Sequence, residues 1–309
     1  MKKSIRSIIA FAVASALVLS IFTFAFAAEQ ATPYDDSLFF EYGEYTIHYR
    51  IIRAEEKIGQ IFMIHGFALS GYCWTNLAEL LSDAGYDCVL ADLPDFGYST
   101  RETAETDKLP REEIMHALML ELSSDPWFVA GHSMGGYIAL ALAQSYPQSV
   151  KNLLLYGTAG NSGAGAAVTG LMNNAVFIKV MGGLMERAGR CAPIVRLLLA
   201  AALADCSYSR SYDVEKVTDP YRIEGTGAGA IYSFSMLPLT DYDAVSEMPP
   251  ILFVNGDKDF VITDRARTAL RSALPEGSAD VVVNGGGHMF IENMADKTAE
   301  ITLGFLADK

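Results

Sequence analysis

A serine between two glycines marks the stretch of this chain where chemistry is most expected. Ser133 lies in Gly131-His132-Ser133-Met134-Gly135, after the apolar run 127–130 and directly before a helix-forming segment. In a tight strand-to-helix turn, side chains at the glycine positions would collide with neighbouring backbone, and the serine hydroxyl is held clear of the sheet edge. The N–H groups at the start of the following helix would stabilise an anion formed there. The pattern makes Ser133 the candidate nucleophile.

A serine hydroxyl needs an adjacent base, and the chain offers five histidines. We expect His48 and His116 at surface positions, and His132 to point away from the turn that holds Ser133. His65 is expected to hold loop backbone in place. His288 follows the last predicted strand in a glycine-rich turn and precedes a helix. We therefore predict His288 to be the general base and then the general acid.

A carboxylate must orient that histidine, and two candidates follow one buried strand. Asp257 and Asp259 come directly after the apolar run 250–254. Both reach the carboxyl edge of a parallel sheet, where the sites of such folds gather. Asp92 also follows a strand, but it precedes the serine, and we expect it to fix its own loop. The residues alone leave the choice between Asp257 and Asp259 open.

Apolar runs alternate with helix-like segments along most of the chain. The opening segment 38–52 reads as a β-hairpin, and later runs read as strands buried on both faces: 60–64, 88–91, 127–130, 152–156, 250–254 and 279–283. Helical patterns cover 72–84, 110–122, 265–274 and 292–306. This alternation implies right-handed crossovers. We therefore predict an α/β fold, with a mostly parallel, doubly wound sheet of about eight strands flanked by helices.

The alternation stops after the sixth predicted strand. Residues 157–239 contain no strand-like run, and 164–204 are rich in Ala, Leu, Met and Val. We predict a helical cap at 157–239, inserted into an α/β core formed by 38–156 and 240–309. Such a cap would bind substrate and exclude water. The alternative is that these apolar helices simply belong to the core.

The N-terminus resembles an export signal. Three basic residues are followed by the uncharged apolar run 7–28, which includes the small-residue site Ala25-Phe26-Ala27. We predict a signal peptide at 1–27, a leader at 28–37 and a secreted or extracytoplasmic protein. Because the run approaches the length that spans a bilayer, retention as a membrane anchor is the alternative.

Charge and cysteine content limit the partners. The chain has 37 acidic and 23 basic residues, which disfavours binding to nucleic acid, or to an anionic membrane surface unless the N-terminal segment is an anchor. The four cysteines lack metal-ligand spacing, so no metal site is predicted. Cys191 and Cys206 are close enough in sequence to form a disulfide, but the sequence does not establish the pairing.

Together these segments resemble the landmarks of the α/β-hydrolase superfamily in the order serine, acid, histidine. The matching segments are His65-Gly66-Phe67, Asp92-Leu93-Pro94-Asp95-Phe96-Gly97-Tyr98-Ser99, Gly131-His132-Ser133-Met134-Gly135-Gly136, Gly256-Asp257-Lys258-Asp259 and Gly287-His288. The resemblance implies that Asp259, rather than Asp257, is the acid. It also implies an oxyanion hole formed by the backbone N–H groups of Phe67 and Met134, supported by the motif residues His65, Gly66, Gly131 and Gly135.

The chain departs from the family pattern at Asp95, where relatives usually have glycine. We expect a charge there, on a loop that borders the pocket. Ser133 at the turn argues against relatives that use aspartate as nucleophile, such as haloalkane dehalogenases and epoxide hydrolases.

The resemblance implies a serine hydrolase that cleaves carboxylic esters without a metal or organic cofactor. The apolar cap favours a small, apolar ester substrate. The same triad also serves amide, thioester and carbon-carbon bond hydrolysis and acyl transfer, and some members of a fold bind ligands without turnover. The sequence does not separate these alternatives.

Overall fold

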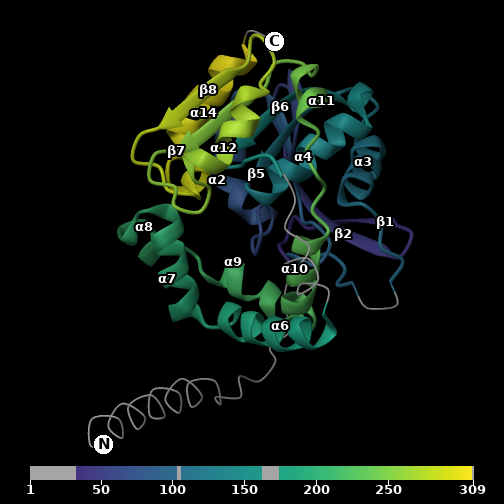
Figure 1. Cartoon of the computed structure of the whole chain (residues 1–309), viewed down its shortest axis with the longest axis vertical. Coiled ribbons are helices and arrows are strands. Elements are labelled where there is room, and N and C mark those ends of the chain that lie inside the picture. Colours follow the sequence, from purple (N-terminus) through teal and green to yellow (C-terminus); the bar gives the residue numbers. More distant parts are fainter. Residues whose placement is uncertain (1–32, 103–105, 162–173, 308–309) are drawn as a thin grey trace, which may run out of the picture.

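A twisted eight-stranded sheet forms the centre of the protein. The computed structural model describes residues 33–102, 106–161 and 174–307 (Figure 1). The strands are β1 (Leu38–Tyr42), β2 (Tyr45–Ile52), β3 (Gly59–Ile64), β4 (Tyr86–Ala91), β5 (Trp127–His132), β6 (Val150–Tyr156), β7 (Leu252–Gly256) and β8 (Ala279–Val283). Their order in the sheet is β1-β2-β4-β3-β5-β6-β7-β8. The β1–β2 and β2–β4 pairs are antiparallel and the other pairs are parallel, which confirms the predicted fold class.

Helices cover both faces of the sheet, as expected of right-handed crossovers. One face carries α3 (Arg111–Leu122), α4 (Met134–Ser145) and α12 (Asp264–Ser272), and the other carries α2 (Thr75–Asp83), α13 (Phe290–Asn293) and α14 (Ala295–Leu306). The short 3-10 helix η1 (Gly71–Trp74) precedes α2, and η2 (Pro147–Ser149) follows α4. The prediction of one closing helix over 292–306 was wrong. The segment is broken at Met294, whose backbone is not helical (φ −125°, ψ 35°).

The segment between β6 and β7 forms a helical layer beyond one end of the sheet, which we call the cap (Figure 1). Its described elements are α6 (Ala175–Gly189), α7 (Ala192–Leu203), α8 (Cys206–Ser211), α9 (Glu215–Thr218), η3 (Pro220–Arg222) and α10 (Thr226–Ser235); α11 (Tyr242–Ser246) leads back to the core. Helices α6 and α10 pack closely because small residues face each other. A Cβ on Gly182 would lie 2.7 Å from the backbone of Ala228.

None of the helices in the described ranges is both long and apolar enough to cross a membrane. The predicted signal peptide at 1–27 and the first part of the predicted leader lie outside these ranges. All four cysteines, including Cys191 and Cys206, are free thiols in the structure.

The end of the predicted leader is packed against the body of the protein. The Arg50 guanidinium and the Lys216 ammonium each lie 4.6 Å from the centroid of the Tyr34 ring, and this ring stacks on Tyr72. Asp36 forms an ion pair with Arg50 at 2.7 Å. Cation-π contacts and this ion pair therefore hold the described part of the leader.

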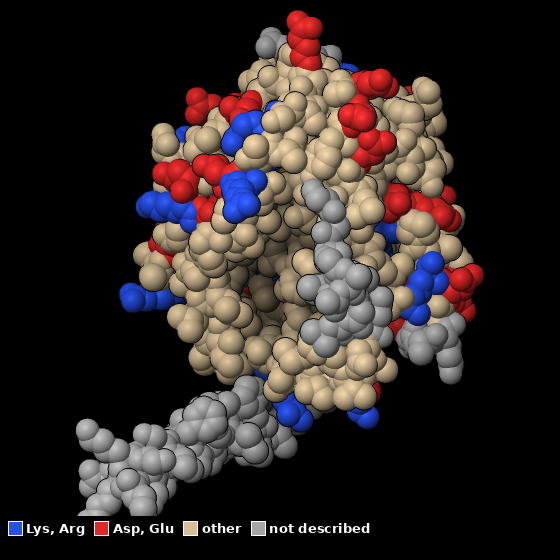
Figure 2. All heavy atoms as spheres, viewed as in Figure 1, with Lys and Arg blue, Asp and Glu red and all other residues tan. Residues whose placement is uncertain are grey.

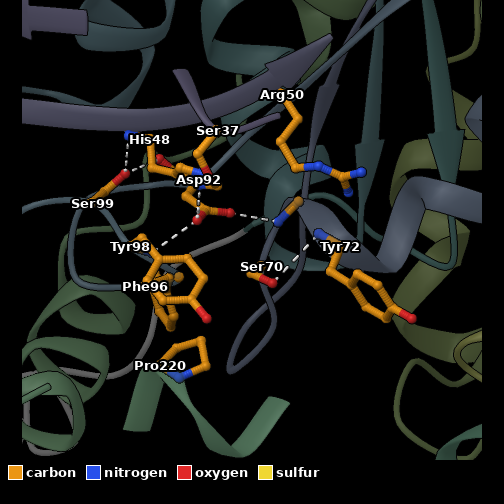
Figure 3. A network of polar contacts seen from close by, with 12 residues as sticks. Ser37, His48, Arg50, Ser70, Tyr72, Asp92, Phe96, Tyr98, Ser99 and Pro220 are labelled. Carbon is orange, nitrogen blue, oxygen red and sulfur yellow. Dashed lines mark hydrogen bonds and ion pairs between the residues drawn. The ribbon is translucent and has the colours of Figure 1, made fainter. Parts of the chain in front are cut away.

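Asp92, which directly follows β4, holds three segments together (Figure 3). Its carboxylate accepts hydrogen bonds from the backbone N–H groups of Gly71 (2.7 Å) and Tyr98 (2.8 Å) and lies 2.7 Å from His48 Nδ1. His48 Nε2 lies 2.8 Å from Ser37 Oγ. Burial alone would raise the pKa of Asp92, but its contacts with His48 lower it. The expectation that His48 lies at the surface was wrong, because this cluster buries its ring.

A buried charge cluster joins the core to the cap. Asp95 is fully buried. We expected its charge to lie on a loop that borders the pocket, but Asp95 does not line the cavity over Ser133. Its carboxylate lies 3.0 Å from Arg111 Nη2 and accepts a hydrogen bond of 2.7 Å from the Ser233 hydroxyl of α10. Arg111 also pairs with Glu102 at 2.8 Å. Burial raises the pKa of Asp95, and the Arg111 charge only partly offsets this. The cluster therefore fixes α10 to the core through polar contacts.

We expect Arg111→Ala to lower the free energy of unfolding by about 3–5 kcal/mol, because it strands two buried carboxylates. Arg53 is the matched control, since it forms an ion pair with Asp87 but its side chain is exposed. Arg53→Ala should lower the free energy of unfolding by at most about 1 kcal/mol. Urea denaturation of both variants measures the difference. Equal losses would show that the cluster contributes no more than a surface ion pair.

Candidate active site

Ser133 lies in a strained turn between β5 and α4. Its backbone has φ 50° and ψ −117°, a conformation that non-glycine residues rarely adopt. A Cβ on Gly131 would lie 2.6 Å from the carbonyl oxygen of Gly135, and a Cβ on Gly135 would lie 2.1 Å from that of Ile64. The two flanking glycines are therefore required by close backbone packing, and they let α4 begin directly at the serine.

The structure brings Ser133, His288 and Asp259 together. His288 Nε2 lies 2.9 Å from Ser133 Oγ, and His288 Nδ1 lies 3.0 Å from Asp259 Oδ2. The three residues follow β5, β8 and β7, so the carboxyl edge of the parallel sheet gathers them from distant parts of the sequence. Asp257 is not part of this group, because its carboxylate accepts a hydrogen bond from the backbone N–H of Gly285.

Asp259 is held as a buried carboxylate. Its Oδ1 accepts hydrogen bonds from the backbone N–H groups of Val261 and Ile262, at 2.8 and 3.0 Å. Its Oδ2 also accepts one from Arg267 at 2.7 Å. Burial alone would raise the pKa of Asp259, but the hydrogen bond and charge of His288, followed by those N–H groups, lower it. The carboxylate is therefore ionised and aligned with the imidazole.

Sequence reasoning missed Arg267. It lies on α12 and forms a buried ion pair with Asp259, with side-chain exposures of 4% and 0%. Its position in the sequence could have indicated burial, because Arg267 lies three positions before Leu270 and therefore on the same face of the helix. These two are the buried residues of α12. Several charged residues in the same helix obscure that signal.

Two buried histidines hold the backbone around the site. His132 Nε2 donates to the carbonyl oxygen of His288 at 2.9 Å, and burial lowers the pKa of His132 to about 3. His65 Nε2 accepts from the backbone N–H of Leu93 at 3.0 Å, while its Nδ1 lies 2.7 Å from the carbonyl oxygen of Gly66. Both rings are therefore neutral. His132 holds the backbone at His288, and His65 holds the loop before Phe67.

The predicted oxyanion donors lie on two segments next to the nucleophile. A Cβ on Gly66 would be 3.1 Å from Ser133 Cβ, which places the Phe67 loop against the turn. Met134 is the first residue of α4. In the described ranges neither N–H donates to a backbone carbonyl. The Phe67 ring packs against Phe234 of α10, with centroids 5.5 Å apart, so this loop contacts the cap. The oxyanion role of both residues stays a prediction.

A cavity of about 320 Å³ lies over Ser133 and His288, between the core and the cap. Its lining is mostly apolar: Phe67, Ala68, Leu69, His132, Met185, Ala188, Gly189, Val195, Leu198, Leu199, Ala202, Val217, Tyr221 and Met289. None of these described lining residues is an acid, lysine or arginine. Figure 2 shows the corresponding hollow, bordered largely by uncharged residues. The cavity suits a neutral, apolar group and disfavours a charged one.

Comparisons with known proteins agree with this architecture. A family model described as the alpha/beta hydrolase fold matches residues 60–186. The chain belongs to the α/β-hydrolase superfamily. This hydrolase is 26% identical over 253 residues to Lipase 3 of Moraxella sp. (strain TA144), covering 77% of this chain and 74% of that protein. It is 24% identical over 264 residues to Lipase 1 of Psychrobacter immobilis, covering 78% and 74%.

Solved structures share the fold of this hydrolase. A meta-cleavage product hydrolase from Pseudomonas fluorescens IP01 superimposes with a TM-score of 0.66 at 17% identity, covering 85% of this chain and 95% of that one. This likeness establishes the fold alone. Within the described ranges, no group of three or more His, Cys, Asp or Glu side chains is arranged to hold a metal ion.

A buried carboxyl group lies where α13 of this hydrolase meets the cap. Glu292 on α13 accepts a hydrogen bond of 2.8 Å from the Tyr212 hydroxyl of the cap, and the Asn76 amide lies 3.5 Å from its other oxygen. Burial raises the pKa of Glu292 to about 8. Since an unfolded glutamic acid has a pKa of about 4.3, the folded protein keeps a proton that the unfolded chain releases.

We expect the contribution of Glu292 to stability to be complete below about pH 4 and to be lost as the pH rises to about 8. Glu292→Gln should flatten this pH dependence and raise the free energy of unfolding at pH 8 by a few kcal/mol. Denaturation at several pH values tests this, with Glu215→Gln on the exposed surface of α9 as the control. If both variants give the same curve, the carboxyl group is not protonated in the folded protein.

Proposed function

We propose that this protein is an exported serine hydrolase that cleaves carboxylic esters of apolar substrates. The observation that carries the proposal is the chain of hydrogen bonds from Ser133 through His288 to Asp259, which lies at the floor of an apolar cavity. Two similar proteins bear the name lipase, which supports ester hydrolysis. Export rests on the sequence of residues 1–27.

The geometry supports an acyl-enzyme mechanism. Ser133 Oγ attacks the ester carbonyl carbon while His288 Nε2 takes the hydroxyl proton, and Asp259 holds Nδ1–H and stabilises the imidazolium. The N–H groups of Phe67 and Met134 would hold the oxyanion, each donor being worth roughly 3 kcal/mol. Collapse of the tetrahedral intermediate breaks the ester bond, and His288 protonates the departing alcohol. Water then attacks the acyl-serine with His288 again as base, which releases the acid and restores Ser133.

The cavity sets the size and polarity of the proposed substrate. Its volume is about 320 Å³. This is at the small end of ligand pockets, which run from about 300 to 1,000 Å³. The substrate is therefore a neutral ester with a short or medium apolar group. The triad and the two N–H donors complete this reaction without a metal or organic cofactor.

We expect Ser133→Ala to lower the turnover of p-nitrophenyl esters by about 10⁴-fold or more and to abolish labelling by a fluorophosphonate probe. The control is Ser37→Ala, because Ser37 also lies within hydrogen-bond distance of a histidine. Ser37→Ala should label like the wild type. Labelling that persists in Ser133→Ala, or a wild-type protein that hydrolyses none of the esters, would refute the proposal.

Adjacent alanines on α7 allow a test of the cavity. Ala202 lines it, whereas Ala201 is exposed on the helix surface. Ala202→Phe should lower kcat/KM at least about tenfold for the longest ester that the wild type accepts, while the acetate ester is cleaved normally. Ala201→Phe should leave the whole chain-length profile unchanged. A profile that Ala202→Phe leaves unaltered would place the apolar part of the substrate elsewhere.

A further inference from the structure

Helices α6 and α7 of the cap expose a set of large apolar side chains, which we call the cap patch. It consists of Val176, Val180 and Leu184 on α6 and Leu197 and Leu198 on α7. The α6 members recur every four residues, so they lie along one face of that helix. Val176 and Leu197 are 71% and 72% exposed. A helix face of this kind is normally buried against a partner.

The charge of these two helices is opposite to that of the whole protein. The range 175–203 contains four basic residues and one acid, in a chain where acids outnumber bases by 37 to 23. Glu186, the single acid, forms an ion pair with Arg190. Lys179 and Arg187 are exposed on α6, next in sequence to members of the cap patch or within one turn of them. Apolar side chains flanked by exposed cations are typical of helices that lie on a lipid surface.

One member of the cap patch also lines the active-site cavity. Leu198 is 60% exposed and also lines the cavity over Ser133. Figure 2 shows that the described residues next to the hollow on this face of the protein are largely uncharged. The first described residues also lie at the cap, because the Tyr34 ring contacts Lys216 of α9. In the sequence, the apolar run 7–28 is therefore followed within a few residues by a segment that contacts the cap.

We propose that α6 and α7 dock on the lipid–water interface of a membrane or lipid particle. The cap patch enters the boundary between headgroups and acyl chains, and Lys179 and Arg187 contact lipid phosphates. The cavity then opens towards the lipid, and a neutral ester reaches Ser133 without crossing bulk water. A second copy of this chain fits the face less well, since a symmetric contact would bring Lys179 and Arg187 of both copies together.

Vesicle flotation tests the proposal with the chain that begins at Ala28, which contains every described residue. The probe is phosphatidylcholine vesicles, with and without phosphatidylglycerol. We expect Val180→Glu and Leu197→Glu each to weaken binding about tenfold. Ile58→Glu and Leu120→Glu are matched controls, because both side chains are exposed and apolar but lie on the core. Both controls should bind as the wild type does. Lys179→Glu should weaken binding more on vesicles that contain phosphatidylglycerol.

Three results would overturn docking on lipid. These are a wild-type chain that does not float with vesicles, equal weakening by the two patch variants and the two control variants that replace an apolar residue with glutamate, and a dimer in sedimentation that Leu197→Glu dissociates without any vesicle binding. Hydrolysis of a soluble acetate ester by each variant checks that it is folded. This assay also separates the two proposals, because vesicle binding by a protein that hydrolyses no ester would refute the proposed function and leave docking intact.

Discussion

The imidazole of His288 depends on two hydrogen bonds made at opposite sides of one ring. One reaches Ser133 at the end of β5 and the other reaches Asp259 at the end of β7, while His288 itself follows β8. A shift of any of these strand ends by about 1 Å would break one bond. The close packing of Gly131 and Gly135 against neighbouring backbone, and the brace from His132 to the His288 carbonyl, keep the three ends in register.

The cap and the core are joined by polar contacts on two sides of an apolar cavity. On one side Ser233 of α10 reaches Asp95, and on the other Tyr212 reaches Glu292. Buried polar groups of this kind specify geometry more than they add stability, because each must recover the cost of leaving water. The apolar lining supplies the space for a substrate, and the polar contacts determine where the cap lies over Ser133.

Local patterns in the sequence predicted where the strands lie and that most of them run parallel. Parallel strands buried on both faces read as continuous apolar runs, and the carboxyl ends of those runs are where Ser133, Asp259 and His288 were expected. The choice of Asp259 over Asp257 needed the resemblance to a family, because both follow the same strand. The structure then separates them by their partners, His288 for one and the Gly285 backbone for the other.

What the sequence did not reveal depends on pairings between distant segments. His48 was expected at the surface because its partner Asp92 lies 44 residues away, and only the fold brings the two together. Arg267 was missed because its charge suggests a solvated helix face, yet it pairs with Asp259. In each case the burial of a polar side chain was decided by a partner that no local pattern identifies.

The backbone of Asp95 adds to the cost of having an aspartate at this position. It adopts φ 74°, a left-handed conformation that glycine occupies without strain and that costs other residues of the order of 1 kcal/mol. An aspartate introduced there alone would carry that strain and an unpaired buried charge. Arg111 and Ser233 offset part of the second penalty, so the effects of substitutions at these three residues on stability should not be additive.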